Sequence, residues 1–327
     1  MRFIIYGAGG VGGVIGAQLF KGGEDVVLIA RGAHLAALQS EGLRYETPFD
    51  DVRLPIPAVG HPGEISPGSD DVFVLTCKSQ HTLTVLEDLR ATHGDRVPVV
   101  CCQNGVANER MAQRRFSDVY AMLVYLPAQL LEPGRIQCHA KLKSGVLDVG
   151  MYPGGTDDRC EGIARRFSSV NLSVKPDPAV MRLKYQKLLV NLNNALEAIT
   201  PPSDERQAVL REMKAEARAC FEAAGIDCAS DDEAAARRAG VLAMGEIPGV
   251  DRQGGSSRQS LLRATGDIEA DYLNGEITGL GRQWSVPTPA NVVVQRLSVE
   301  LARAKGAPGS IAINEVRALI EAERLRG

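Results

Sequence analysis

A glycine pattern near the start of the chain has the residue types and the spacing that bind a pyrophosphate. Gly7, Gly9 and Gly12 form a Gly-x-Gly-x-x-Gly sequence, and Gly10 lies in the same turn. In such a pattern the first glycine permits a tight turn, the second lets the backbone approach the phosphates, and the third lets a helix pack close to a sheet. The free N–H groups at the start of that helix then face the phosphates. The pattern therefore predicts a dinucleotide site.

The segments on either side of the glycines predict the elements that position them. An apolar run at residues 3–6 leads directly into the pattern, and a second apolar run at residues 26–29 follows it. Strand, glycine turn, helix and strand in this order form a βαβ unit, which is the context that makes the motif specific.

The residue after the second apolar run indicates which dinucleotide binds. An NAD site usually has an acidic residue there for the ribose 2′-hydroxyl, whereas an NADP site has a basic group for the 2′-phosphate. This chain has Arg31 and no acid at that point. A guanidinium can pair with a phosphate through two hydrogen bonds. We therefore predict NADP(H) as the cofactor, and a solvated loop arginine is the alternative.

Two polar segments follow apolar runs that are typical of buried parallel strands. Lys78 follows the run at residues 71–77, and Asn104 follows the run at residues 97–102. Ligands of open α/β sheets bind outside the carboxyl ends of the strands, so both residues are candidates for the nicotinamide end of the cofactor. The alternatives are a solvated lysine and an ordinary Asn-Gly turn.

Further polar residues lie on helices predicted in the second half of the chain. Lys187 and Asn191 are four residues apart and share a helical face, Lys184 lies roughly on it, and Asn194 follows seven residues after Lys187. Such a strip is more often solvated surface than a site.

A later predicted helix at 257–281 adds two candidates. Ser257 has the position of an N-cap, and Glu269 lies three turns further on. One charged residue on a helix indicates little by itself.

The order of these patterns predicts two domains. Strands alternate with helices to about residue 175, which indicates an α/β N-terminal Rossmann-type dinucleotide-binding domain at 1–176. An all-α C-terminal domain is predicted at 177–327, after the segment Lys175–Pro178. One strand is predicted over 52–59 and a mobile loop over 245–255. Helices are predicted at 180–199, 204–224, 231–244, 257–281, 288–305 and 312–324.

Composition excludes several classes of function. The formal net charge is −3, with 24% charged and 44% hydrophobic residues, and no basic stripe favours nucleic acid. No apolar run approaches membrane-spanning length. The seven cysteines form no Cys-x-x-Cys pair and no metal-ligand spacing, so no metal site is expected. The glycines near the N-terminus follow a phosphate-binding pattern instead of that of a signal peptide. A cytoplasmic enzyme is the expectation.

Taken together, these segments resemble the ketopantoate reductase family over essentially the whole chain. The motifs occur in order as GAGGVG, ARGAHL, TCKSQ, QNGV, EPGRI, KLLVN, and SSRQ followed by EADYLNG. The resemblance implies NADPH-dependent reduction of 2-dehydropantoate to pantoate, a step of pantothenate and coenzyme A synthesis. It implies that Lys187 is the catalytic lysine, which protonates the carbonyl oxygen, and that Glu269 helps to bind and orient.

The resemblance also implies binding roles. Lys78 matches a lysine at the cofactor–substrate junction, and Asn104 matches an asparagine beside the nicotinamide. Asn191 and Ser257 match substrate-binding positions. Asn194 is a candidate for the second substrate-binding asparagine, because alanine stands at position 195 where many family members have that residue.

Other departures also fall in the substrate half of the chain. Arg258 and Leu261 replace a methionine and an aspartate that are common in the family. In the first domain, shortly after Lys78, His81 aligns with a glutamine of the family. Three alternatives therefore stay open: a 2-dehydropantoate reductase, a reductase of another branched 2-oxo acid, and a non-enzymatic NADP-binding sensor. The oligomeric state is open between a monomer and a homodimer.

Overall fold

The computed structural model describes residues 1–250 and 254–326. Contacts divide the chain into two compact units. The first comprises Met1–Gln103, Asn108–Lys184 and the described part of Ser230–Asp251. The second comprises Asn104–Ala107, Tyr185–Ala229 and the described part of Arg252–Gly327. Helix α6 (Val180–Asn191) contributes to both, and the short Asn104–Ala107 segment belongs with the helices.

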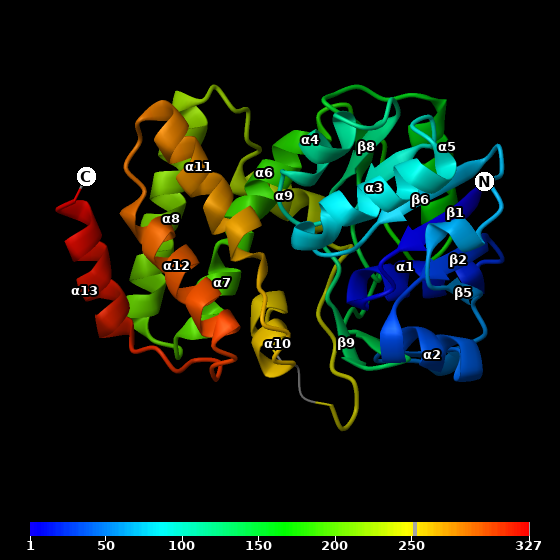
Figure 1. The fold of residues 1–327 in the computed structure, drawn as a ribbon, viewed down its shortest axis with the longest axis horizontal. Coiled ribbons are helices and arrows are strands. Elements are labelled where there is room, and N and C mark those ends of the chain that lie inside the picture. Colours follow the sequence, from blue (N-terminus) through cyan, green and yellow to red (C-terminus); the bar gives the residue numbers. More distant parts are fainter. Residues whose placement is uncertain (251–253, 327) are drawn as a thin grey trace. The chain divides into compact units, whose positions relative to one another are not determined.

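A seven-stranded sheet forms the centre of the first unit (Figure 1). Its order is β11-β8-β7-β6-β1-β2-β5, and every neighbouring pair is parallel except β8 and β11. The chain builds outward from β1 in one direction and then in the other, so the sheet has a switch point beside β1, where ligands of such folds bind. The strands are β1 Arg2–Tyr6, β2 Asp25–Ile29, β5 Ala58–Val59, β6 Asp71–Leu75, β7 Val99–Cys101, β8 Val119–Met122 and β11 Val149–Met151.

Continuous apolar sequence explains why these strands lie inside the unit. All five residues of β6 are buried, as is expected of a parallel strand covered on both faces. The side chains of β1 alternate between two cores: Phe3 and Ile5 belong to one, and Ile4 and Tyr6 belong to the other.

Helices cover both faces of the sheet, and a smaller sheet adjoins α1. Its order is β4-β3-β10-β9, with β3 and β10 parallel. Its strands are β3 Leu43–Glu46, β4 Asp51–Leu54, β9 Ala128–Glu132 and β10 Arg135–Cys138. The helices are α1 Gly10–Lys21, α2 Gly32–Glu41, η1 Pro62–Glu64, η2 Ser79–His81, α3 Thr82–His93, α4 Asn108–Gln113, α5 Asp158–Ser168 and α9 Asp231–Arg238.

The second unit is helical. Glu216 on α8 joins two of its helices by accepting hydrogen bonds from the backbone N–H groups of Ala290 and Asn291, at 2.8 and 3.0 Å. Both N–H groups lie in the first turn of α12, where a carboxylate also suits the helix dipole. Besides part of α6, the helices are α7 Asn193–Ile199, α8 Asp204–Ala223, α10 Ser256–Leu262, η3 Glu269–Tyr272, α11 Asn274–Trp284, α12 Pro289–Arg303 and α13 Ile313–Arg324.

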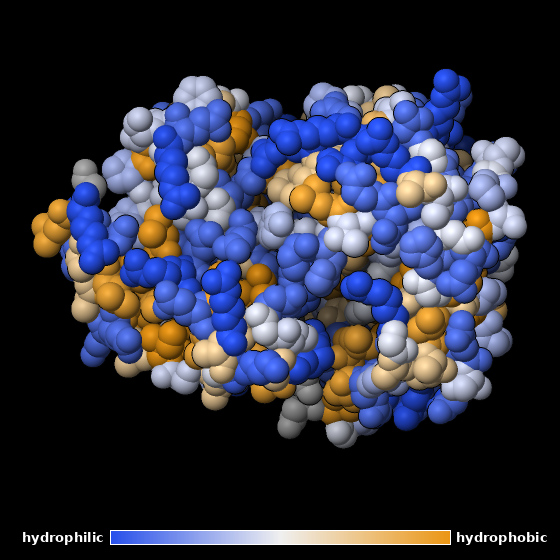
Figure 2. All heavy atoms as spheres, viewed as in Figure 1, coloured by the Kyte–Doolittle hydropathy of each residue, from blue (hydrophilic) through white to orange (hydrophobic). Residues whose placement is uncertain are grey.

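The predicted fold class is confirmed: an N-terminal Rossmann-type α/β domain is followed by a helical C-terminal domain. The boundary at 176/177 stays a prediction. Within the described residues, no helix combines the length and the apolar character needed to cross a membrane. Figure 2 shows one face, on which apolar side chains lie in separate patches among hydrophilic ones.

Three predicted elements are wrong in extent. The strand at 52–59 is two strands in different sheets, because Pro55 and Pro57 interrupt it. The helix at 231–244 ends at Arg238, shortly before Gly240 with a φ of +68°. The helix at 257–281 is divided into α10, η3 and α11.

Left-handed backbone explains the division of that last helix. Ala264 and Gly266, with φ of +49° and +79°, follow the end of α10. Consequently Glu269 lies in a 3₁₀ turn instead of an α-helix. Ser257 is not the N-cap as predicted, because Gly255 has that position. The predicted loop at 245–255 includes residues 251–253, which lie outside the described residues.

Candidate cofactor and substrate site

The glycine turn of the first unit has the open geometry that a pyrophosphate needs. Gly7 has a φ of +111°, and a Cβ there would lie 2.7 Å from the backbone nitrogen of Cys77. A Cβ on Gly12 would collide with the carbonyl oxygen of Gly7 and the hydroxyl of Thr76. A Cβ on Gly9, by contrast, would have no atom within 4 Å. Neighbouring atoms therefore leave no room for a side chain at Gly7 or Gly12, whereas the space beside Gly9 is open.

The start of α1 leaves its backbone donors available to a ligand. Gly9 is the N-cap and has no side chain to cap the first N–H groups. The Thr76 hydroxyl, at the end of β6, donates to the carbonyl oxygen of Gly7 at 2.8 Å. Gly10 begins the helix close to β9, because a Cβ on it would lie 3.3 Å from backbone atoms of Gln129.

Arg31 supplies a positive charge beyond the end of β2. It is the N-cap of α2, it is exposed, and its guanidinium makes no hydrogen bond or ion pair with any residue in 1–250 or 254–326. Burial and Asp88 raise the pKa of Tyr6, at the end of β1, while Arg31 lowers it. The charge of Arg31 thus acts on the carboxyl end of β1.

Buried polar side chains join the carboxyl ends of β6 and β7, where Lys78 lies. The amide of Gln103 donates to the Cys77 carbonyl oxygen and to the Thr82 hydroxyl, both at 2.8 Å. Thr82 in turn donates to the Asn108 side chain at 2.8 Å. Lys78 is partly buried and is the N-cap of η2. It directly follows Cys77, whose carbonyl oxygen accepts the hydrogen bond from Gln103.

Two elements of the second unit contact one Asn-Gly turn, Asn104-Gly105. The Asn191 amide donates to the side-chain oxygen of Asn104 at 3.1 Å. Gly105 has a φ of +80°, and a Cβ on it would lie 3.0 Å from the carbonyl oxygen of Tyr272. The turn therefore contacts both α6 and η3, the element that begins with Glu269. Glu269 is 8% exposed and Asn191 is 3% exposed.

Lys187 shares α6 with Asn191 and precedes it by one turn. It is partly buried and belongs to the second unit together with the Asn-Gly turn. The helix therefore carries an ammonium and an amide on the face that the 3.6-residue repeat brings together.

Ser257 and Asn194 lie near the start of α10, which packs against α7. The side-chain oxygen of Asn194 is 3.6 Å from where a Cβ on Gly255 would lie, and Gly255 directly precedes α10. Ser257 is buried, and Ala195 is completely buried. Of the two neighbours Asn194 and Ala195, Asn194 is thus the one with a polar side chain near the start of α10.

Two family models match the chain. Residues 3–154 match the model described as ketopantoate reductase PanE/ApbA, and residues 179–302 match its C-terminal model. The chain belongs to the ketopantoate reductase family. It is an oxidoreductase.

Relatives of this ketopantoate reductase family member extend over nearly the whole chain. The 2-dehydropantoate 2-reductase of Pyrococcus abyssi is 26% identical over 307 residues, which cover 90% of this chain and 95% of that protein. The crystal structure of a PanE/ApbA family ketopantoate reductase from Ralstonia eutropha JMP134 has a TM-score of 0.76 and 26% identity, covering 99% and 100% of the two chains. D-mandelate dehydrogenase, solved with NADH and anilino(oxo)acetate, shares the fold with a TM-score of 0.75 and 20% identity over 97% and 100%.

Lys184 of this family member is a buried charge that sequence patterns assigned to the polar strip of α6. Only 3% of it is exposed, and its ammonium lies 2.8 Å from a carboxylate oxygen of Glu109, which is completely buried. It also donates to the carbonyl oxygens of Gln103 and Met122, at 2.9 and 3.1 Å. Its position one turn before Lys187 was visible in the sequence, but its distant partners were not.

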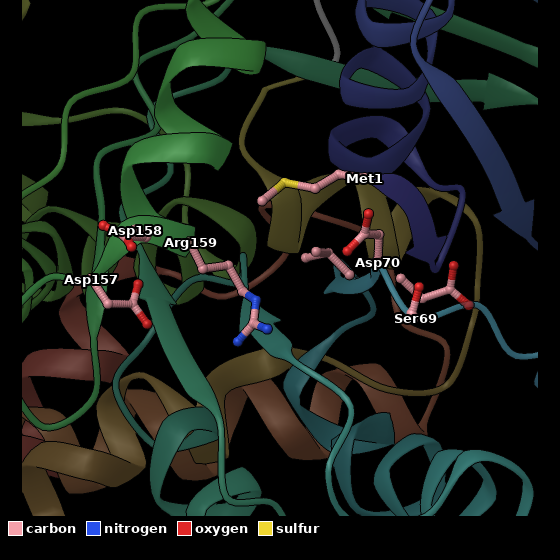
Figure 3. A pocket seen from close by; sticks show the side chains of 8 residues that line it. Met1, Ser69, Asp70, Asp157, Asp158 and Arg159 are labelled. Carbon is pink, nitrogen blue, oxygen red and sulfur yellow. The ribbon is translucent and has the colours of Figure 1, made fainter.

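A cavity of about 430 Å³ lies in the first unit, and Figure 3 shows the side chains that line it. Met1 and Asp71 line it, at the amino ends of β1 and β6, opposite the edge where such sheets bind ligands. Two of its four aspartates have structural roles: Asp71 pairs with Arg2 at 2.7 Å, and Asp157 caps α5 at the Cys160 N–H. In the described part of the chain, no three His, Cys, Asp or Glu side chains gather as a metal site.

Proposed function

We propose that the chain catalyses NADPH-dependent reduction of 2-dehydropantoate, a branched 2-oxo acid, to pantoate. The observation that carries this proposal is the hydrogen bond from Asn191 to Asn104, on the helix that holds Lys187 one turn earlier. An ammonium and two amides can bind a carboxylate and a carbonyl oxygen through charge-assisted and neutral hydrogen bonds.

The residues of the first unit fit a nicotinamide dinucleotide. The open face at Gly9 and the uncapped start of α1 suit a pyrophosphate. The guanidinium of Arg31, which has no partner within 1–250 and 254–326, suits a 2′-phosphate. When bound, NADPH supplies the hydride that adds to the keto carbon. The residues that would hold it are Gly7, Gly9, Gly10, Gly12, Arg31, Lys78 and Asn104.

Lys187 would hold and deliver the proton. Its Nζ donates a hydrogen bond to the carbonyl oxygen of the substrate, stabilises the negative charge that develops there, and then transfers the proton to it. The buried carboxylate of Glu269 holds either Lys187 or a substrate hydroxyl in place. Asn191, Asn194 and Ser257 donate to the carboxylate and the hydroxyl of the substrate.

The substrate could also be a less polar branched 2-oxo acid. Ala195 offers only a methyl group, so a hydrogen bond to the substrate hydroxyl depends on Asn194. A non-enzymatic NADP-binding sensor is the alternative of another class. Lys187 and Glu269 favour the enzyme, because a sensor needs no proton donor.

A product assay tests this proposal. The protein is incubated with NADPH and each of a panel of 2-oxo acids, and the 2-hydroxy acids are identified by mass spectrometry. We expect pantoate from 2-dehydropantoate. Binding of NADPH without reduction of any acid in the panel would instead support the sensor. A 2-hydroxy acid formed only from another member of the panel would correct the substrate.

A further inference from the structure

The imidazole of His34 joins the glycine turn to a hairpin of the small sheet. His34 lies on α2, and its Nε2 is 2.6 Å from the carbonyl oxygen of Ala8, between Gly7 and Gly9. The backbone N–H of Gly134, in the turn between β9 and β10, donates to its Nδ1 at 2.9 Å. One side chain therefore links two segments that are far apart in the sequence.

These two contacts determine where the ring carries its hydrogen. A backbone N–H can only donate, so Nδ1 must present a lone pair to Gly134. A neutral imidazole then has its hydrogen on Nε2, which donates to the Ala8 oxygen. A protonated ring would turn a second N–H toward the N–H of Gly134, and that hydrogen bond would be lost.

The surrounding backbone leaves little room for another arrangement. Gly134 has a φ of +78°, and a Cβ on it would lie 2.9 Å from the Cβ of Ala37 on α2. A Cβ on Gly10 would lie 3.3 Å from the Cα of Gln129 on β9. The hairpin thus abuts both α2 and the start of α1, and His34 is the polar link among them.

We propose that His34 is a positioning residue for the dinucleotide: its neutral ring holds the glycine turn in the conformation that binds the pyrophosphate, and protonation of the ring weakens that binding. This inference rests on the proposed function, because it places a dinucleotide at the glycine turn. The Ala8 carbonyl is part of the peptide group that contains the Gly9 N–H. The Gly9 N–H itself donates to the Gly7 carbonyl oxygen at 2.7 Å, and Gly9 is the N-cap of α1. A displaced Ala8 carbonyl therefore displaces Gly9 and with it the start of the helix whose first N–H groups would face the phosphates.

The environment of His34 gives the direction of the pH effect. Burial lowers the pKa of His34 below its ordinary value of 6.5, and the backbone hydrogen bond opposes this only in part. The charged groups on the packed elements are Arg31 and Glu41 at the two ends of α2, Lys21 at the far end of α1, and Glu132 and Arg135 beside the hairpin turn. Arg135 is paired with Glu46 at 2.8 Å and with Glu132 at 3.2 Å, and the glycine turn has no titratable side chain. The ring is neutral at pH 7, so NADPH affinity falls as the pH falls through the lowered pKa.

Titration of NADPH fluorescence tests this inference directly. The dissociation constant is measured from about pH 5 to about pH 8 for the wild type, His34→Gln and His34→Ala. Glutamine keeps one donor and one acceptor but carries no charge. At neutral pH we expect His34→Gln to bind within about threefold of the wild type and His34→Ala to bind roughly tenfold more weakly, because a hydrogen bond is lost. In acid the wild type should weaken by roughly tenfold relative to His34→Gln.

The comparison between wild type and His34→Gln removes the titration of the cofactor's own phosphate, which affects both proteins equally. His61→Gln, at the exposed histidine that is the N-cap of η1, is the matched control and should keep the wild-type pH profile. Identical pH profiles of wild type and His34→Gln, or neutral-pH affinity retained by His34→Ala, would overturn the inference. Failure of the folded wild type to bind NADPH would contradict the proposed function itself.

Discussion

Arg31 is the residue at which NADP and NAD would be distinguished. Its guanidinium is exposed and unpaired among the described residues, so it can form charge-assisted hydrogen bonds with a 2′-phosphate. Arg31→Ala should weaken NADPH binding by roughly tenfold to a hundredfold and should leave NADH binding within about twofold. Equilibrium titration with both cofactors measures this change.

The matched control for Arg31 is Arg114→Ala, an exposed arginine of the same unit. It should not alter either affinity. If Arg31→Ala keeps the wild-type preference between NADPH and NADH, the recognition of the 2′-phosphate does not depend on Arg31.

From the sequence we could predict the candidate residues whose role depends on the backbone conformation of their own segment. Gly7 and Gly12 could be recognised in the sequence. The atoms that leave no room for a side chain at these positions belong to the same βαβ unit or to residues at the end of the adjoining strand. The roles of His34 and Lys184 could not be predicted, because their partners lie far away in the sequence. The available signal in the sequence was that His34 follows Arg31, the residue predicted to bind the 2′-phosphate, by three positions. Its second contact, with the N–H of Gly134, forms only in the folded hairpin.

At the scale of elements, the buried pair of Lys184 and Glu109 joins α6 to α4 and to the carboxyl ends of β7 and β8. Lys184→Met would leave the Glu109 carboxylate buried and unpaired, which typically costs about 3–5 kcal/mol of the free energy of unfolding. We expect a clear decrease in the urea concentration at the unfolding midpoint.

The double variant Lys184→Met/Glu109→Leu separates charge from packing. It removes both buried charges, so it should recover most of the lost stability. A single variant as stable as the wild type would show that Glu109 is protonated or hydrated in the folded protein. A double variant no more stable than the single one would show that the lysine acts through its backbone carbonyl contacts.

Element boundaries were predictable where a single residue type determines them. The strand, glycine turn and helix at the N-terminus follow directly from their sequence, and α7 ends before Pro201. The break after α10 was not predictable, because apolar spacing continues through Ala264, a non-glycine residue with positive φ. The burial of Ser257 and Glu269 follows from how α10 and η3 pack in the second unit. This packing cannot be predicted from the residues that surround them in the sequence.

At the scale of the whole molecule, we expect substrate choice to depend on the helical unit. A site built to hydrogen-bond a hydroxyl rejects analogues without it strongly, whereas an apolar site discriminates weakly. Because alanine replaces the second asparagine at 195, we expect kcat/KM for 2-dehydropantoate and 2-oxoisovalerate to differ by less than about two orders of magnitude.

Asn194→Ala tests whether the neighbouring asparagine supplies the missing contact. It should lower kcat/KM for 2-dehydropantoate and leave that for 2-oxoisovalerate, which lacks the hydroxyl, nearly unchanged. A preference of the wild type for 2-dehydropantoate by several orders of magnitude would contradict the expectation that the two acids are weakly discriminated. The assignments of the cofactor and of Lys187 would stand in that case.

The most direct test of the proposed reaction separates cofactor binding from proton transfer. The glycine turn and Arg31 belong to the first unit, whereas Lys187 belongs to the second. Lys187→Ala should therefore bind NADPH as the wild type does, while its kcat at saturating NADPH and 2-dehydropantoate falls by about 10²–10⁴-fold. Lys175→Ala, at an exposed lysine, should keep wild-type turnover. Wild-type turnover by Lys187→Ala would contradict the central claim that Lys187 supplies the proton.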